Sequence, residues 1–241
     1  MVFDVHYIDE TESTNLWLKE EGGGTLHPQP TAVVADYQTA GRGQGTNSWE
    51  SERGKNLTFS VRVDGGGRKA NRQFLISMAV SLALTKTLSQ YLPVPAAIKW
   101  PNDIYVGDRK ICGILIEHTL QGDCIKDSII GIGLNVNQTQ FVSDAPNPVS
   151  MAMVSGRPFD REQVLQDLLE NIGLMLEERD ESLIRTAYLQ QLYRREGVFP
   201  YSDAQGTFQA RLLRVEDDGR LVLQDTEGLV RTYVFKEVRF I

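Results

Sequence analysis

Hydrophobic and polar residues alternate through much of this chain, in the manner of β-strands. In one such stretch Leu57, Phe59, Val61 and Val63 share a face, which is typical of a strand that buries one side. Runs that are apolar on both faces predict strands at the centre of a sheet. The predicted strands cover Phe3–Ile8, Thr31–Tyr37, Asn56–Val63, Ala96–Trp100, Ile104–Val106, Ile111–Ile116 and Lys126–Asn137.

Helical spacing of apolar residues occurs in fewer segments. The four residues that begin at Asp160 resemble a capping box and predict the start of one helix. Ser150 predicts the cap of a short helix, and a further helix is predicted over Glu181–Tyr193. The proline-containing stretch 25–30 is predicted to be a connection. The longest helix is predicted over Asn71–Leu92, with a buried stripe of Phe74, Leu75, Met78, Leu82, Leu84 and Leu88.

After Arg195 the pattern changes to short strands joined by tight turns. Strands are predicted over Gly206–Val215, Arg220–Asp225 and Leu229–Phe235. This meander predicts a small SH3-like β-barrel packed behind the main domain. The expected division is therefore a main domain over residues 1–195 and a small domain over residues 196–241.

Composition and charge narrow the possible functions. The formal net charge of −7 argues against general nucleic-acid binding, which needs a basic surface. No basic helix precedes the core, so no DNA-reading module is expected. No apolar run reaches the ~20 residues that cross a bilayer, and no signal peptide opens the chain. Cys112 and Cys124 lack metal-ligand spacing, which predicts free thiols in a reducing cytoplasm.

The glycine-rich stretch from Gly41 to Trp49 is the first candidate site. Glycines let backbone N–H groups converge on an anion, and Arg42 adds a forked donor for a phosphate or carboxylate. Trp49 offers a flat face for stacking. A flexible surface turn is the alternative interpretation.

Glu12-Ser13-Thr14-Asn15, ahead of a short helical pattern at Leu16–Glu20, is the second. Ser13 would cap the helix by accepting a bond from a first-turn N–H. The same hydroxyls and amide could instead bind a small neutral polar group.

A predicted hairpin places Lys110 near Asp103. A two-residue turn at Gly107-Asp108 pairs Val106 with Arg109 and Tyr105 with Lys110, and puts Asp103 diagonally across from Lys110. A lysine that starts a central strand must emerge at its end or meet an anion. A purely structural ion pair with Asp103 is the alternative.

The strand Lys126–Asn137 carries two further signals. Gly131 and Gly133 predict close approach of another backbone or of a ligand. Asn135 and Asn137 share a face, and their amides suit a nucleobase edge, although capping of the strand end is the plainer explanation for one of them.

Together these motifs resemble those of biotin–protein ligases. The resemblance covers nearly the whole chain, and the order and spacing of the motifs agree with the family. The motifs are Glu12-Ser13-Thr14-Asn15, Gly41-Arg42-Gly43 with Trp49, Lys99-Trp100-Pro101-Asn102-Asp103, Arg109-Lys110-Ile111-Cys112-Gly113-Ile114-Leu115 and Gly131-Ile132-Gly133-Leu134-Asn135-Val136-Asn137.

The resemblance implies an α+β fold of the class II synthetase-like type, with a mixed β-sheet, helices on one side and the small SH3-like domain. It implies that biotin and Mg²⁺-ATP give biotinyl-5′-AMP. The biotinyl group then passes to a lysine of a biotin carboxyl carrier domain. A ligase-only protein that binds no DNA and no membrane is expected, with a homodimer possible through an edge strand.

The resemblance also implies residue roles. Lys110, Arg42 and Asp103 would be catalytic, with Asp103 positioning or deprotonating the acceptor amine. Besides Arg42 and Lys110, the biotin-binding set would be Ser13, Thr14, Asn15, Gln38, Gly41, Gly43, Gln44 and Gly113. The ATP-binding set would be Trp49, Lys99, Asn102, Asn135 and Asn137, with the metal ligands left open.

Within the glycine loop the chain departs from the family, because many members carry further basic residues where this one has Gln44-Gly45-Thr46-Asn47-Ser48. Two other functions compete with the biotin ligase. One is a lipoate ligase or octanoyl transferase of a related fold, and the other is a non-catalytic biotin-binding protein. The glycine loop and C-terminal domain argue against the first, and intact Lys110, Arg42 and Asp103 against the second.

Overall fold

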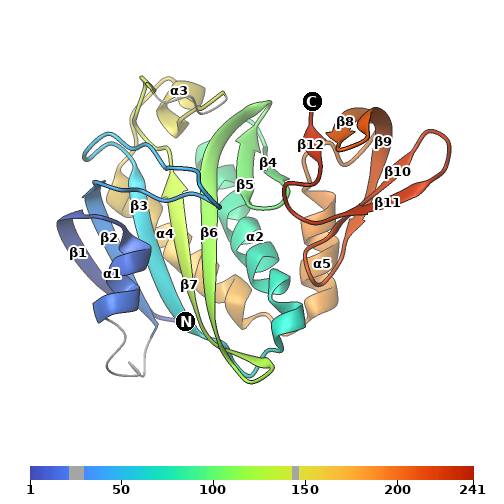
Figure 1. Ribbon diagram of the computed structural model, residues 1–241. Helices are drawn as coiled ribbons and strands as arrows, with labels where there is room; N and C mark the ends of the chain where they lie inside the picture. Colours follow the sequence, from blue (N-terminus) through green and yellow to red (C-terminus); the bar gives the residue numbers. More distant parts are fainter. Residues whose placement is uncertain (22–29, 143–146) are drawn as a thin grey trace.

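The computed structural model describes residues 1–21, 30–142 and 147–241, so most of the connection predicted over 25–30 lies outside the described residues. Its larger sheet has seven strands in the order β1-β2-β3-β7-β6-β5-β4, with β1 and β2 parallel and the other neighbours antiparallel (Figure 1). The predicted mixed sheet is therefore confirmed. The strands are β1 (Asp4–Thr11), β2 (Thr31–Gln38), β3 (Leu57–Asp64), β4 (Ala96–Lys99), β5 (Asp103–Val106), β6 (Arg109–Gln121) and β7 (Cys124–Leu134).

Most helices cover one face of this sheet. Asp160 caps α4 by accepting bonds from the N–H groups of Glu162 and Gln163, and Ser150 caps α3 by accepting one from Met153. Both predicted caps are confirmed. The helices and the short 3-10 turn are α1 (Thr14–Glu21), η1 (Ala70–Arg72), α2 (Phe74–Tyr91), α3 (Met151–Ser155), α4 (Arg161–Glu177) and α5 (Glu181–Gln190).

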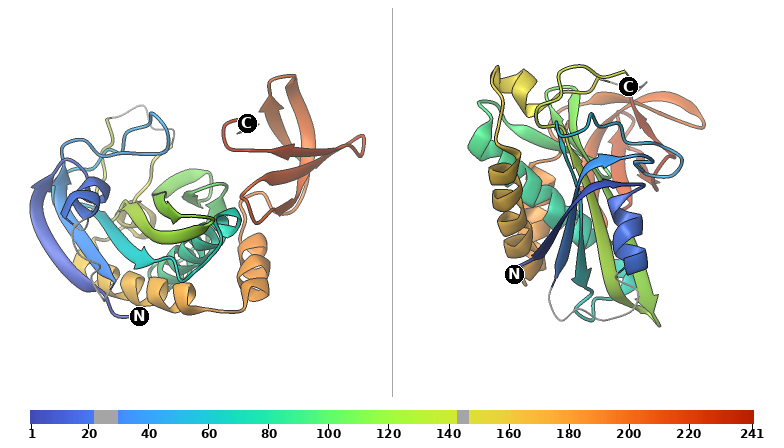
Figure 2. Two further views of the ribbon diagram at one scale, coloured as in Figure 1. Left: turned by 60° about the horizontal axis from the view of Figure 1, so that its bottom comes forward. Right: turned by 90° about the vertical axis from the view of Figure 1, so that its left-hand side faces the viewer.

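Helix α1 lies on the opposite face, which the sequence did not predict (Figure 2, right). Its Leu18 packs with Val33 and Ile129 in a small cluster of their own. The neighbouring Ala32 and Ile130 belong instead to the main core under α2 and α4. Because side chains alternate across a strand, the α1 face is separate from the core face and is free to carry a site.

The C-terminal residues form a second sheet of five strands, in the order β11-β10-β9-β8-β12. The small β-domain is confirmed, but the predicted barrel is not closed, because β11 and β12 are the two edges of an open sheet. Short strands at Phe199 and Arg239 were missed, since each is too brief to show a period. The strands are β8 (Phe199–Asp203), β9 (Gly206–Val215), β10 (Leu221–Asp225), β11 (Val230–Tyr233) and β12 (Arg239–Phe240).

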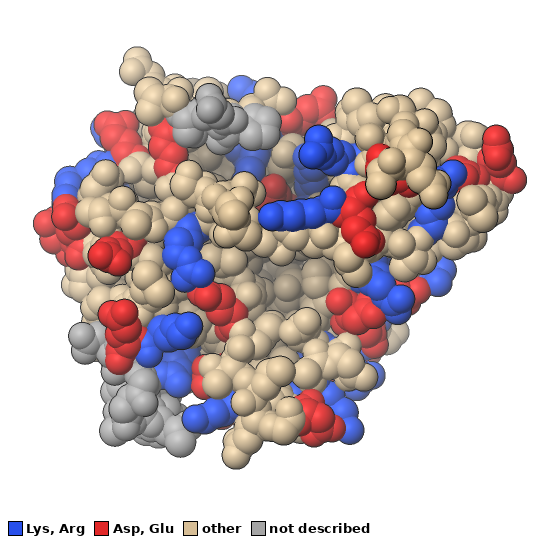
Figure 3. Space-filling model, viewed as in Figure 1, with Lys and Arg blue, Asp and Glu red and all other residues tan. Residues whose placement is uncertain are grey.

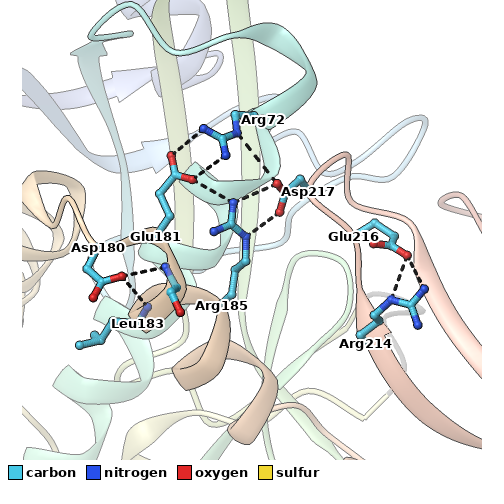
Figure 4. Close-up of polar contacts among 9 residues, drawn as sticks. Arg72, Asp180, Glu181, Leu183, Arg185, Arg214, Glu216 and Asp217 are labelled. Atoms are coloured by element: carbon cyan, nitrogen blue, oxygen red, sulfur yellow. Dashed lines mark hydrogen bonds and ion pairs between the residues drawn. The ribbon is translucent and has the colours of Figure 1, made fainter.

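The turn between β9 and β10 holds the two sheets together. The carbonyl of Gly219 accepts a 2.8 Å bond from the indole of Trp100. Gly219 has a φ of +90°, and a Cβ there would lie 2.7 Å from the Phe74 ring. Beside it, Arg185 of α5 donates two hydrogen bonds, of 2.6 and 2.9 Å, to the Asp217 carboxylate (Figure 4).

The small domain was predicted to pack behind the main domain. It lies instead beside β4, at one edge of the larger sheet (Figure 1). In the described part of the chain, no helix is long and apolar enough to cross a membrane.

Candidate active site

A cleft of about 690 Å³ lies on the α1 face of the larger sheet, and its floor is made of glycine. Gly113 of β6 and Gly133 of β7 are directly paired, so no side chain rises from the centre of this face. Figure 3 shows the molecule hollowed on this side, with basic and acidic side chains around the hollow. The absence of Cβ atoms leaves room for a flat group against the strands.

Trp49 occupies that room. A Cβ on Gly133 would lie 2.2 Å from its ring, and one on Gly113 would lie 3.1 Å away. Among the described residues nothing bonds its buried indole nitrogen, and the buried Oε1 of Gln44 is likewise unpartnered. Because a buried polar atom without a partner is costly, both atoms suit hydrogen bonds with a ligand.

A row of hydrogen bonds borders the floor. The Ser60 hydroxyl donates to Asn15 Oδ1 at 2.6 Å, so in its 2.6 Å contact with Thr14 it must accept. Asn15 Nδ2 then donates to Glu117 at 2.8 Å. A Cβ on Gly131 would lie 2.3 Å from Asn15, which explains this glycine. Close approach to both β7 glycines was predicted, and here the approaching groups are the side chains of Asn15 and Trp49.

This row divides the residues predicted to bind biotin. The Asn15 amide is committed to protein partners at both ends. The side-chain oxygen of Gln38 accepts a 2.8 Å hydrogen bond from the Thr14 N–H. Ser13 was predicted to accept a bond from a first-turn N–H of α1, but here Gln38 does so. In the described part of the chain no residue bonds the Ser13 hydroxyl, which faces the cleft. Ser13 and the amide nitrogen of Gln38 are thus the atoms available to a polar ligand.

Lys110 and Asp103 meet at one end of the floor. Their Nζ and Oδ1 atoms are 2.7 Å apart, and Lys110 Nζ lies 5.7 Å from the centre of the Trp49 ring. The predicted hairpin pairs are confirmed, although a bulge at Ile111 places Asp103 opposite Gly113. The pair lines the cleft, where Lys110 can exchange its carboxylate partner for a ligand anion.

Lys99 and Asn102 line the same end. Burial lowers the pKa of Lys99, whose ammonium group donates to the Tyr105 hydroxyl at 2.9 Å. It also lies 5.5 Å from the centre of the Phe240 ring of the C-terminal sheet. Asn102 Nδ2 donates to the carbonyl of Ile114 at 2.7 Å, which fixes the amide against β6.

The glycine loop folds back on itself over the cleft. Arg42 pairs with Ser48 across the loop, and the N–H of Gly43 donates to Asn47. A Cβ on Gly41 would lie 2.5 Å from the Trp49 carbonyl, so this fold requires glycine there. Arg42 forms a 3.2 Å ion pair with Glu117, which connects the loop to the polar row.

Three of the predicted site residues do not line the cleft: Gly41, Asn135 and Asn137. Asn137 bonds the carbonyl and the N–H of Phe159 at 2.8 and 2.9 Å, so its amide is used by the protein. Asn135 is buried and donates to the Val149 carbonyl at 3.1 Å. These contacts support the plainer interpretation for Asn137, whose amide secures the end of β7. The buried Oδ1 of Asn135 has no partner among the described residues, so this amide is not fully used by the protein.

Several residues of the site were not predicted from the sequence. Ser60 and Glu117 are polar positions on the glycine face of β3 and β6, and alternation was the signal that could have found them. The C-terminal residues that line the cleft gave no such signal, because tertiary contact alone brings them there. They are Phe235, Lys236, Val238, Arg239 and Phe240.

Comparison with known proteins shows the family of the chain. The model of the biotin/lipoate A/B protein ligase family matches residues 7–135, more than half of the chain. The bifunctional ligase/repressor BirA of Bacillus spizizenii is 32% identical over 94% of this chain and 71% of its own length. The biotin–[acetyl-CoA-carboxylase] ligase of Mycobacterium tuberculosis is 27% identical over 68% of this chain and 61% of its own.

Among solved structures, the biotin protein ligase of Aquifex aeolicus in complex with biotin and ATP has the same fold. It has a TM-score of 0.80 at 24% sequence identity and covers 99% of both chains. The family match and the BirA relative together carry the assignment: the chain belongs to the biotin/lipoate A/B protein ligase family.

Proposed function

We propose that the chain is an ATP-dependent biotin–protein ligase. A carboxylate oxygen of biotin attacks the α-phosphorus of ATP, which gives biotinyl-5′-AMP and releases pyrophosphate. The amine of a lysine on a biotin carboxyl carrier domain then attacks the acyl carbon, loses a proton and displaces AMP. The observation that carries the proposal is one cleft that holds Lys110, a side-chain-free glycine floor and the polar atoms of Ser13 and Gln38.

Each group in the cleft then has a task. Ser13 and Gln38 bond the polar ring of biotin, while Thr14 and Asn15 hold the row that orients them. Lys110 moves from Asp103 to the reacting carboxylate and α-phosphate, where fixed positive charge stabilises the transition state. Asp103 is then free to receive the acceptor amine. Trp49, Lys99 and Asn102 take the nucleotide.

Magnesium fits this arrangement as an ion bound mainly through the phosphates of ATP. Within residues 1–21, 30–142 and 147–241, no three carboxylate, histidine or cysteine groups come together as a metal site. Mg²⁺ commonly keeps water and binds through substrate phosphates and one or two carboxylates. Asp103 is the carboxylate that lines this cleft, and the metal would supply further charge neutralisation on the phosphates.

Two rival functions are less well supported. A lipoate ligase or octanoyl transferase would share the fold, but the Mycobacterium tuberculosis relative, which aligns with 68% of this chain, is a biotin–[acetyl-CoA-carboxylase] ligase. A non-catalytic binding protein would have no need for Lys110 and Asp103 paired at the end of the glycine floor.

We also propose how the chain is divided and where it acts. Residues 1–195 carry out catalysis, and residues 196–241 support the cleft. The protein acts in the cytoplasm. Backbone bonds between Ile98 and residues Gln191 and Tyr193 cover the β4 edge. The other edge of the larger sheet, β1, is therefore our candidate for a homodimer contact.

Labelled biotin, ATP and a purified carrier domain test the function. Label should enter the carrier in an ATP-dependent manner and should not enter a carrier whose acceptor lysine is replaced by arginine. Transfer to both carriers, or to neither, would refute the proposal.

A further inference from the structure

The turn that leads from β11 to β12 extends a lysine across the cleft to the glycine loop. A Cβ on Gly45 would lie 2.5 Å from Nζ and 3.3 Å from Cε of Lys236, so the lysine side chain lies directly on this glycine. Lys236 lines the cleft together with Gln44 and Lys110. The position of Lys236 is therefore set by contact between the β11–β12 turn and the glycine loop.

The backbone of Lys236 is held in an unusual conformation. Its φ is +73°, in the left-handed region that favours glycine. The surrounding turn is closed by the bond from the Glu237 N–H to the Val234 carbonyl, and the Glu237 carboxylate accepts from the Val234 N–H at 2.9 Å. Phe235 packs edge-on against Trp100, which secures the turn against the larger domain. A strained non-glycine residue in a well-braced turn next to a cleft suggests a function for its side chain.

The charges of the cleft point to what Lys236 binds. Arg42 and Lys110 are each paired with a carboxylate. Lys236 has no carboxylate partner among the described residues, and its Nζ atom lies 5.7 Å from the centre of the Phe235 ring. The loop beneath it, Gln44 to Ser48, contains no basic residue. Lys236 is thus a cation without an anionic partner among the described residues, and it lies beside a loop whose side chains are neutral.

We propose that Lys236 binds the polyphosphate of ATP, holding the β- and γ-phosphates that leave as pyrophosphate. The inference rests on the proposed ligase function, because that function supplies the nucleotide. A flexible ammonium suits a phosphate chain, since it acts as a point charge without a fixed bonding plane. The C-terminal sheet thereby supplies a charge that the loop lacks.

Calorimetric titration of the whole chain with ATP, inorganic pyrophosphate and AMP tests the proposal without requiring turnover. Lys236→Gly removes the charge while accepting the positive φ, so it is the least disruptive variant. It should weaken ATP and pyrophosphate binding about tenfold, the effect of losing ~1.4 kcal/mol from one charge-assisted contact. AMP binding should stay within about twofold, on the same scale.

Lys236→Arg should retain ATP binding, and Lys86→Ala, on the exposed side of α2, is the matched control. Unchanged ATP and pyrophosphate binding in Lys236→Gly would overturn the proposal. An equal loss of AMP and ATP binding would also overturn it. Because nucleotide binding is measured without biotin, failure of biotin transfer in the unaltered protein would refute the ligase function separately.

Discussion

The side chains of the cleft differ in whether their polar atoms are already bonded within the protein. The Asn15 amide is fully engaged, so it shapes the structure around the site. Ser13, Trp49 Nε1 and Gln44 Oε1 have no partner in the described part of the chain. Recognition of a substrate by these atoms would need no internal bond to be broken.

Loss of the Lys110 side chain should impair adenylate formation and leave the fold intact. Lys110→Ala should slow adenylate formation by about 10²–10³, the range for removal of one transition-state donor. Its side chain is only partly buried, so the protein should remain folded by circular dichroism. Pyrophosphate release measured with biotin and ATP checks the rate. Release at the unaltered rate would contradict the role of Lys110.

Gly133 should not accept a side chain. In Gly133→Ala the new Cβ would lie 2.2 Å from the Trp49 ring, so Trp49 must leave the floor. We expect a loss of about 1–3 kcal/mol in stability, as for other overpacked sites, together with weaker ATP binding.

The double variant with Trp49→Ala separates the steric effect from others, because it removes the ring that clashes. Adding Gly133→Ala to a Trp49→Ala background should cost little stability, as measured by urea unfolding. If the two losses simply add, the contact between Trp49 and Gly133 is not their cause.

Lys99 should make ATP binding sensitive to alkaline pH. Burial lowers the pKa of Lys99, so its positive charge is lost at a lower pH than that of an exposed lysine. ATP affinity should be full below this lowered pKa and should fall as pH rises through it. Lys99→Arg should keep binding to higher pH, because arginine stays protonated. Parallel pH profiles for the two proteins would exclude Lys99 from the nucleotide site.

At the scale of elements, the sequence predicted most strands and helices of the main domain, because each buries one face with a clear period. The β5–β6 hairpin was predicted down to its first two pairs. The bulge at Ile111 was not, since an extra residue in one strand leaves no trace in an apolar run. The face on which α1 lies was also unpredictable from its eight residues alone.

The turn between β9 and β10 should contribute to the stability of the whole chain. Bonding to Arg185 lowers the pKa of Asp217, so its contribution is present above the usual aspartate range and is lost as pH falls through the lowered pKa. Asp217→Asn should cost about 0.5–1 kcal/mol near pH 7, a modest value because the pair is partly exposed to solvent.

Urea unfolding at neutral and acid pH checks this, with exposed Glu170→Gln as the control. The difference between Asp217→Asn and the unaltered protein should disappear in acid. A difference that persists there would show that the ion pair is not its source.

At the scale of the molecule, the cleft depends on both sheets. The larger sheet contributes the glycine floor, the polar row and Lys110, while the turn between β11 and β12 contributes Lys236 and β12 contributes Phe240. The motifs that line the floor were predictable, because they are short and local. The contribution of the C-terminal sheet was not, because docking of the β9–β10 turn on Trp100 and Phe74 places it there.

The central claim is that this cleft joins the carboxylate of biotin to AMP. Exchange of labelled pyrophosphate into ATP, compared with biotin and with lipoate, measures that step alone. We predict exchange that depends on biotin, is not supported by lipoate and is slowed by about 10²–10³ in Lys110→Ala. Exchange with lipoate in place of biotin, or equal exchange without either acid, would contradict the account.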